Sequence, residues 1–359
     1  TLIKQRRHFH SFNALRFVSF LLVFIHHIPV NETSFLSYFT KTGGVGVSFF
    51  FSLSGFLITY ILLAEKLEQN KISLKHFFIK RILKIWPLFY AMLLFAYLTP
   101  FFLDYSNLPS SSDGYKPNWW YSVFFLENYQ MLFTKDFPNV SPLRVMWSLC
   151  VEEHFYLIWG FSLFLLPVKK LPKLILFCIF LAFFVRIIYF KYEILSIDIF
   201  SNIDYFAFGA IPAYLLATKN NILHLINNIS LKTKYSIIPI ILVCIIIFPL
   251  FNESILRFFT PTIYGFLFST LILFTISSRN SILINDKYVI SKLGIYTYGL
   301  YLYHTIFINL FIQLFKNSAI EMKNVLIAIS SLIVTIVISI LSYHLFEKRF
   351  LNWKRYFNP

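Results

Sequence analysis

The sequence is poor in charged residues and cysteine and lacks a P-loop motif, and each of these absences excludes a class of protein or site. Only 13% of the 359 residues are charged, about half the share in soluble globular domains. Cys150, Cys178 and Cys244 lie in or beside apolar runs without paired spacing, so we expect neither a disulfide nor a metal site. The glycine-rich stretch 43–57 has no Gly-Lys-Ser or Gly-Lys-Thr ending, which excludes a P-loop.

Long apolar runs recur from one end of the chain to the other. Hydrophobic residues make up 58% of the sequence and aromatic residues 20%, and the runs are long enough for helices that cross a bilayer. A transmembrane β-barrel would show segments of about ten residues with alternating polarity instead. The pattern predicts one domain, 1–359, with the fold of an all-α polytopic membrane protein. The predicted spans are about 12–30, 43–63, 85–103, 146–166, 174–190, 203–217, 235–250, 260–277, 293–315 and 324–345.

The basic residues are concentrated in alternate connections between these spans. A net charge of +16 by itself suits nucleic acid, but 22 of the 32 Lys and Arg residues fall in the two termini and every second loop. The positive-inside rule produces this distribution. We therefore expect about ten spans, both termini in the cytosol, and no nucleic-acid partner. The strongest basic loop is about 64–84, and an irregular extracytoplasmic loop covers about 104–145.

The first predicted span carries an arginine and two adjacent histidines. Arg16 and His27 are eleven residues apart, which places them on nearly the same helix face, about 16 Å apart along the axis. If they only anchor the helix, Arg16 reaches the inner headgroups and His26 and His27 lie at the outer interface. Alternatively, a histidine acts as a general base in a water-filled cleft. The residues alone leave both interpretations open.

Lys80, Arg81 and Lys84 lie at the inner end of the third predicted span, before Pro87. A generic basic loop anchors a helix at the cytosolic interface. Cations on adjacent helical turns also suit a pyrophosphate or other phosphate group. Pro87 is expected to end or kink the helix.

Glu152 and Glu153 are adjacent carboxylates near the outer start of the fourth predicted span, with Trp147 within one or two turns. Acidic residues suit a helix N-terminus. A carboxylate at the depth of Glu153 is better explained as a partner for a histidine or an arginine.

Weaker candidates lie in later spans. Arg186 and Asp204 are close enough to the outer ends of their spans to pair or to contact an outer substrate. Tyr301 and His304 share a helix face that forms a polar wall, whereas Glu347 reads as an interfacial residue.

Four small residues, Gly44, Ser48, Ser52 and Gly55, recur at spacings of four, four and three. Such a stripe lets two helices pack closely. We expect it to pack against the first span.

These motifs together resemble the membrane-bound acyltransferase-3 family. The segments that carry the resemblance are Arg16 with His27, FFFSLSGFLI, FFIKRILKIWPLFY, WSLCVEEHFYLIW, YGLYLYH and FEKRF, in the order of that family and over essentially the whole chain. The resemblance implies a multi-pass O-acyltransferase of the bacterial cytoplasmic membrane, in the stand-alone form without an SGNH hydrolase domain. It favours His27 over His26 as the catalytic histidine.

The resemblance also implies roles for the other candidates. Arg81 and Lys84 match a pair of arginines, and Lys84, His154 and Asn202 depart from the usual arginine, glutamine and arginine. Acetyl-CoA, or another acyl-CoA, is the expected donor substrate, with no metal. The expected catalytic residues are His27, Glu152 and Glu153; the donor-binding residues are Arg16, Lys80, Arg81 and Lys84; the acceptor-binding residues are Trp147, Arg186, Asp204, Tyr301 and His304.

The implied reaction transfers an acyl group from the cytosolic donor to a hydroxyl of an extracytoplasmic glycan. His27 acts as general base or transient acyl carrier, and Glu152 or Glu153 sets its tautomer. A homo-oligomer or partner glycan-assembly proteins are compatible with this activity. Two alternatives are a proton-coupled transporter, disfavoured by the lack of repeat symmetry, and a non-catalytic subunit of a polysaccharide export complex.

Overall fold

The computed structural model describes residues 9–30, 36–106, 113–251, 255–277, 279–316 and 322–357. The predicted basic N-terminal segment 1–8 and residues 107–112 of the predicted outer loop lie outside these ranges. The described part of the chain is helical, with one isolated β-bridge between Tyr115 and Pro138. The predicted all-helical class is therefore confirmed.

Each of the ten apolar runs forms a helix. The helices are α1 (Ser11–His27), α2 (Leu36–Thr42), α3 (Gly44–Gln69), α4 (Leu74–Tyr105), α5 (Trp119–Val123), α6 (Glu127–Thr134), α7 (Ser141–Arg144), α8 (Trp147–Leu165), α9 (Leu171–Lys191), α10 (Ile199–Ala217), α11 (Ile222–Asn228), α12 (Leu231–Tyr235), α13 (Ile237–Ile247), α14 (Thr260–Ile276), α15 (Val289–Leu293), α16 (Thr297–Leu314), α17 (Lys323–Ser342) and α18 (Lys348–Trp353). A π-helical turn, Tyr343–Glu347, joins α17 to α18.

Fewer than ten of these helices have the length and apolarity of a membrane span. Among the described residues, five qualify, or up to six if the pair Ile222–Asn228 and Leu231–Ile247, bent by 102°, is one span. Helices α1 and α14 have 17 residues each. Helices α8 and α16 are not among the five, because acidic, histidine and tyrosine side chains lower their apolarity. Five of the candidate site residues lie on these two helices: Trp147, Glu152, Glu153, Tyr301 and His304.

The predicted basic loop 64–84 is mostly helical. Helix α3 continues to Gln69 and α4 begins at Leu74, so only four residues connect them. Pro87 was expected to end or kink the helix. It lies inside α4, which continues over 32 residues, so the helix does not end there. Lys80 and Arg81 therefore lie about one turn before Lys84 on one continuous helix.

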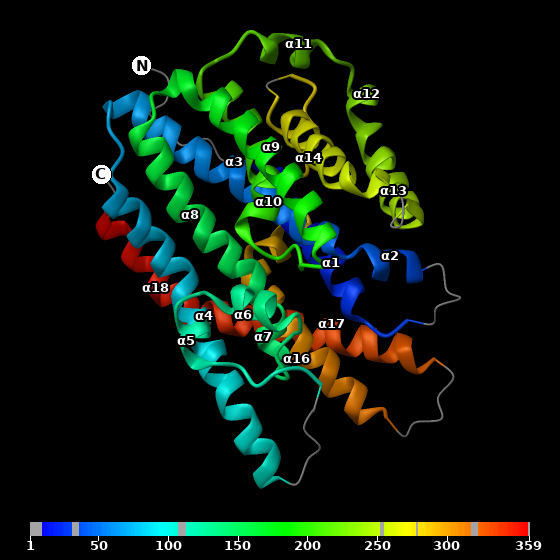
Figure 1. Ribbon diagram of the computed structural model, residues 1–359. Helices are drawn as coiled ribbons and strands as arrows, with labels where there is room; N and C mark the ends of the chain where they lie inside the picture. The colour runs from blue at the N-terminus through cyan, green and yellow to red at the C-terminus, as the bar shows by residue number, and fades with distance from the viewer. Residues whose placement is uncertain are drawn as a thin grey trace.

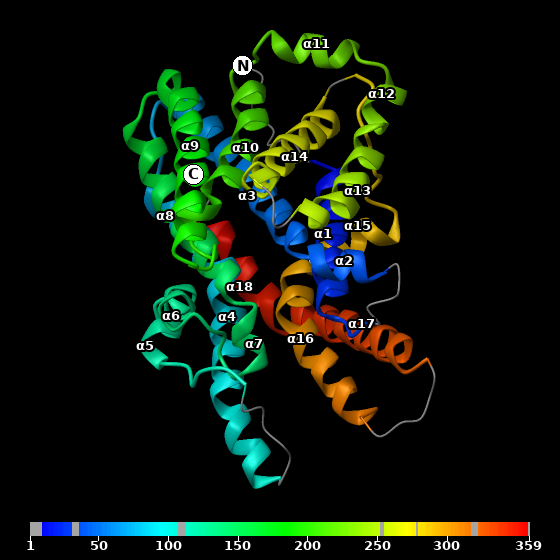
Figure 2. The same cartoon turned by 45° about the vertical axis from the view of Figure 1, so that its right-hand side comes forward.

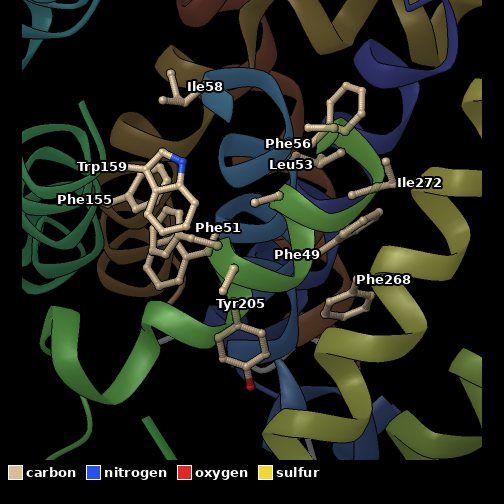
Figure 3. Close-up of a cluster of buried hydrophobic side chains, with 14 of the residues drawn as sticks. Phe49, Phe51, Leu53, Phe56, Ile58, Phe155, Trp159, Tyr205, Phe268 and Ile272 are labelled. Carbon is tan, nitrogen blue, oxygen red and sulfur yellow. The ribbon is translucent and has the colours of Figure 1, made fainter. Parts of the chain in front are cut away.

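Helix α3 is the centre of the bundle. It packs against α1, α8, α10 and α14, and both views of the ribbon show it surrounded by segments from distant parts of the sequence (Figures 1 and 2). Figure 3 shows its aromatic and aliphatic side chains meeting those of α8, α10 and α14. For example, the Phe51 ring stacks on Phe206 at 4.7 Å, and Phe206 stacks on Phe155 at 4.0 Å.

The stripe of small residues on α3 does promote close packing, but mainly with α10. A Cβ atom on Gly55 would lie 2.1 Å from the backbone oxygen of Phe206, and a Cβ on Gly209 would lie 1.9 Å from the backbone oxygen of Ser52. The expected partner, α1, is instead approached by Gly46, where a Cβ would lie 2.4 Å from the Ser19 oxygen. The two helix backbones can approach this closely only where side chains are absent.

Because α3 and α10 approach so closely, one added methyl group at their contact should lower the stability of the protein. Gly55→Ala should destabilise the protein by about 1–3 kcal/mol, because the added carbon meets a backbone oxygen that cannot rotate away. Gly44→Ala is the matched control, since no atom lies within 4 Å of a Cβ at that position. The midpoint of thermal unfolding in detergent is measured for both variants. Equal midpoints would contradict the assigned packing.

The segment 113–146 folds around a buried carboxylate on α6. Glu127 is 1% exposed. It accepts hydrogen bonds from the Tyr115 hydroxyl, at 2.5 Å, and from the Ser122 hydroxyl. Burial raises the pKa of Glu127 above its ordinary value of 4.5, although the two hydroxyl donors act in the opposite direction. The folded segment therefore holds the proton more tightly than the unfolded one.

The raised pKa of Glu127 gives the segment a pH-dependent stability. The stabilisation is complete below the ordinary pKa and is lost as the pH rises through the raised value, where a buried carboxylate forms. We expect protease cleavage within 113–146 to accelerate from pH 5 to pH 8 in the wild type, measured against cleavage elsewhere in the chain. Glu127→Gln should flatten this dependence; an unchanged slope in that variant would assign the effect to another group.

Candidate active site

Helix α1 connects the two parts of the candidate site. It packs against α3, α15 and α16, and the predicted helix is confirmed over Ser11–His27. Arg16 lies in its second turn and is partly buried, and His27 is its last residue and is also partly buried. The two side chains therefore lie at different positions along the helix axis, as their spacing in the sequence predicted.

A cavity of about 140 Å³ lies beside the first half of α1. Arg16, Arg81 and Lys84 line it together with Glu152, so the structure brings together residues from α1, α4 and α8. Tyr301 of α16 lines it as well. Of the other candidates, Lys80, Glu153, Trp147, His27 and His304 are not among its lining residues.

The cavity is rich in positive charge. Arg16 and Arg81 repel each other and both repel Lys84, while Glu152 attracts Arg16, Arg81 and Lys84. The Arg81 Nε atom is buried and has no hydrogen-bond partner in the described part of the chain. Its guanidinium carbon lies 5.8 Å from the centre of the Tyr156 ring. An anion entering the cavity would relieve this repulsion and satisfy the buried nitrogen.

The structure adds two charged residues that the sequence did not place at the candidate site. Glu347, expected at the interface, is only 9% exposed; its carboxylate accepts from Ser342 at 3.3 Å and interacts with Lys84. Lys354 adds a further positive charge near Arg81. The FEKRF segment was the available signal, but the π-helical turn that aims Glu347 inward is not visible in the sequence.

Glu152 faces the cavity rather than the histidines. Its carboxylate accepts hydrogen bonds from the Ser54 hydroxyl at 2.8 Å and from the Tyr156 hydroxyl at 3.0 Å. Glu153 accepts from the Trp86 indole at 3.3 Å, and its second oxygen is buried without a hydrogen-bond partner in the described chain. The expected contact of either carboxylate with His27 is absent from the hydrogen bonds of the described residues.

The partner of His27 is another histidine. The Nδ1 atom of His27 lies 2.9 Å from the Val23 backbone oxygen and 3.4 Å from Nε2 of His304. The two ring centres are 5.0 Å apart. His304, a predicted acceptor-binding residue, is fully buried. His26 is exposed and bonds to the Thr40 backbone oxygen.

Two aromatic side chains lie between the cavity and the histidine pair. Phe50 and Tyr301 both line the cavity, and their ring centres are 6.2 Å apart. The Tyr301 ring is in turn 5.7 Å from His304. Its hydroxyl contacts the Ser148 hydroxyl at 2.7 Å and donates to the Val145 oxygen at 3.0 Å. Tyr301 therefore lies both at the basic cavity and beside His304.

Arg186 and Asp204 form a buried ion pair between α9 and α10. Arg186 Nη2 donates to Asp204 at 2.7 Å, and Nη1 donates to the Ser201 backbone oxygen at 2.9 Å. The side chains are 8% and 0% exposed. Asn202 donates to the Ser196 and Asp198 backbone oxygens at 3.0 and 2.9 Å. This network explains these residues as a helix junction, one of the two roles expected for them.

The remaining candidate, Trp147, contacts α3. Trp147 packs edge-on against Phe51 with ring centres 6.2 Å apart. Within the described ranges, no group of three or more His, Cys, Asp and Glu side chains is placed to hold a metal ion.

The fold and the site define a helical integral membrane protein with a basic cavity inside its bundle and a histidine pair at the end of α1. The family model described as "Acyltransferase domain" (acyltransferase 3) matches residues 9–344. The chain therefore belongs to this acyltransferase family, and the resemblance drawn from its motifs is confirmed.

Individual relatives are enzymes of O-acetylation by name. The chain is 33% identical over 179 residues to "Peptidoglycan O-acetyltransferase OatA" of Listeria monocytogenes, covering 48% of this chain and 27% of that protein. It is 30% identical over 162 residues to "Putative peptidoglycan O-acetyltransferase YrhL" of Bacillus subtilis, covering 44% and 24%. These matches span about a quarter of the relatives' length. No solved structure matches the chain.

The buried ion pair predicts a non-additive stability cycle. Asp204→Leu should destabilise the protein by about 3–5 kcal/mol, because it leaves the Arg186 charge buried and unpaired. Arg186→Met together with Asp204→Leu should lose less than Asp204→Leu alone. Thermal unfolding of the wild type, both single variants and the double variant in detergent measures the cycle. Additive losses would contradict a structural pair.

Proposed function

We propose that the chain is a membrane O-acetyltransferase. It transfers an acetyl group from cytosolic acetyl-CoA to a hydroxyl of an extracytoplasmic glycan, with peptidoglycan as the first candidate acceptor. The family and the printed names of the two relatives support this acceptor class. The alternating basic segments support about ten spans in the bacterial cytoplasmic membrane with both termini in the cytosol.

The observation that carries the proposal is the unbalanced positive charge of the cavity. Placing Arg16, Arg81 and Lys84 together inside a bundle is costly unless anions offset them, and only one of the lining residues, Glu152, is a carboxylate. The diphosphate or 3′-phosphate of acetyl-CoA supplies the missing negative charge. Arg81 offers a buried Nε donor for it. Lys80, one turn before Lys84 on α4, interacts with Lys354 and adds positive charge that attracts the donor.

The cavity holds a part of the donor rather than the whole. Its volume of about 140 Å³ is below the ~300–1,000 Å³ of pockets that enclose drug-sized ligands. The pantetheine arm then runs along α1 past Phe50 and Tyr301 to the level of His27. A shift of these two aromatic side chains completes the route.

His27 performs the proton transfer at the far end of this route. The acceptor hydroxyl gives its proton to His27 as the hydroxyl oxygen attacks the thioester carbon. The carbon–sulfur bond breaks, and the CoA sulfur takes the proton from His27. Glu152 supplies a negative charge at the cavity. Glu153 bonds to Trp86, whose ring lies 5.7 Å from that of Phe125 in the segment 113–146. The glycan approaches near this segment and contacts Trp147.

Replacement of His27 tests the catalytic assignment. His27→Ala should reduce acetyl transfer from labelled acetyl-CoA by about 10²–10⁴-fold, the usual contribution of a general base. His26→Ala is the matched control, because this neighbouring imidazole is exposed. Both proteins are reconstituted in vesicles with a glycan acceptor. Full activity in His27→Ala, or uptake of a solute without acyl-CoA, would refute the proposed enzyme.

Replacement of a cavity cation tests the donor site separately. Lys84→Gln should raise KM for acetyl-CoA about 10- to 100-fold, since a charge-assisted hydrogen bond is worth about 1.5–3 kcal/mol, and should change kcat less. Lys71→Gln removes an exposed lysine between α3 and α4 and should leave KM unchanged. Equal effects of the two substitutions would show that general surface charge, and no specific phosphate site, attracts the donor.

A further inference from the structure

The hydrogen-bond partners of His27 and His304 determine which ring nitrogen of each carries the hydrogen. The Tyr301 backbone oxygen lies 2.6 Å from Nδ1 of His304. A carbonyl oxygen only accepts hydrogen bonds, so His304 Nδ1 carries a hydrogen. In neutral His304 the lone pair is then on Nε2, the atom that faces His27 at 3.4 Å.

The same reasoning fixes the tautomer of His27. Its Nδ1 atom lies 2.9 Å from the Val23 backbone oxygen, which also only accepts. The Nδ1 hydrogen of His27 is therefore shared between the Val23 oxygen and the Nε2 lone pair of His304. His27 Nε2 keeps its lone pair and is available as a base.

The surroundings keep His304 neutral and in place. It is fully buried, and the Phe20 ring stands edge-on to it with centres 6.0 Å apart. A second proton on its Nε2 would point at the Nδ1 hydrogen of His27, so two donors would face each other. Burial of an unpaired charge in this apolar setting is also costly.

We propose that His304 is a positioning residue that holds His27 in the tautomer needed for catalysis. The inference rests on the proposed function of His27. It replaces the expected partners Glu152 and Glu153, whose carboxylates bond elsewhere. His304 orients the base His27 as a third group orients the base in other enzymes, and here that group is a neutral imidazole instead of a carboxylate.

The hydrogen bond from His27 Nδ1 to His304 Nε2 matters most when His27 takes the proton of the glycan hydroxyl. The Val23 oxygen belongs to the same helix turn and receives the helical bond from the backbone of residue 27. His304 comes from another helix, so it prevents the His27 ring from turning about its side-chain bonds. Its lone pair also stabilises the transient imidazolium through the Nδ1 hydrogen until the CoA sulfur takes the proton from Nε2.

Two substitutions of His304 separate positioning from packing. His304→Phe keeps a ring but removes the acceptor, and should lower kcat roughly 10- to 100-fold, less than the full contribution of a general base. KM for acetyl-CoA should stay within about twofold, because His304 does not line the basic cavity. His304→Gln offers an amide oxygen near the position of Nε2 and should recover most of kcat.

A spectroscopic measurement tests the tautomer without relying on turnover. In protein labelled with ¹⁵N-histidine, the His27 signals, assigned by their loss in His27→Ala, should show a protonated Nδ1 and an unprotonated Nε2. In His304→Phe they should shift towards a mixture of tautomers. An unchanged His27 tautomer in His304→Phe, or equal losses of kcat in His304→Phe and His304→Gln, would overturn the inference.

The outcomes distinguish this inference from the proposed function. An inactive His27→Ala with a fully active His304→Phe refutes only the role of His304. A fully active His27→Ala refutes the proposed function and with it the catalytic meaning of the pair. His26→Gln, at the adjacent exposed imidazole, is the control and should leave kcat and the His27 signals unchanged.

Discussion

The structure depends on the cost of holding like charges inside an apolar bundle. Arg16, Arg81 and Lys84 come from two helices and meet at one cavity, and charges buried in a protein are screened less than exposed ones. Glu152 and Glu347 offset part of this charge. The remaining positive charge favours an anion in the cavity, because an anion would offset the repulsion between these side chains.

Such a site requires helices that do not yield under the repulsion. Helix α3 provides this rigidity, because its small residues let α10 approach to backbone contact while its aromatic residues fill the spaces towards α8 and α14. The same helix presents Ser54 to the carboxylate of Glu152 and Phe50 to the cavity. Close packing on one face of α3 thereby fixes polar groups on another.

Much of the site was predictable because its residues are unusual for their surroundings. A charged or titratable side chain in an apolar run stands out, as Arg16, His27 and Glu152 do, and helical spacing gives their relative direction. The partners of these residues were not predictable. Glu152 bonds to Ser54 and Tyr156 instead of a histidine, and His304 reaches His27 from a helix more than 250 residues away in the sequence. Glu347 was expected at the interface, and the interaction of its buried side chain with Lys84 was not; it lies in a π-helical turn that the sequence does not indicate.

The sequence by itself determined the helical class, the positions of the apolar helices and the residue types available for chemistry, since periodicity, apolarity and charge are local properties of the chain. It also determined that α1 presents Arg16 and His27 on one face, because the geometry of an α-helix is fixed. Only the tertiary structure decided which helix packs against the small residues of α3, which side chain bonds to His27, and that Phe50 and Tyr301 stand between the cavity and the histidines. Those outcomes depend on packing between segments that are distant in sequence. Many pairings of helices would satisfy the same local pattern, and the close approach of particular backbones decides which pairing forms.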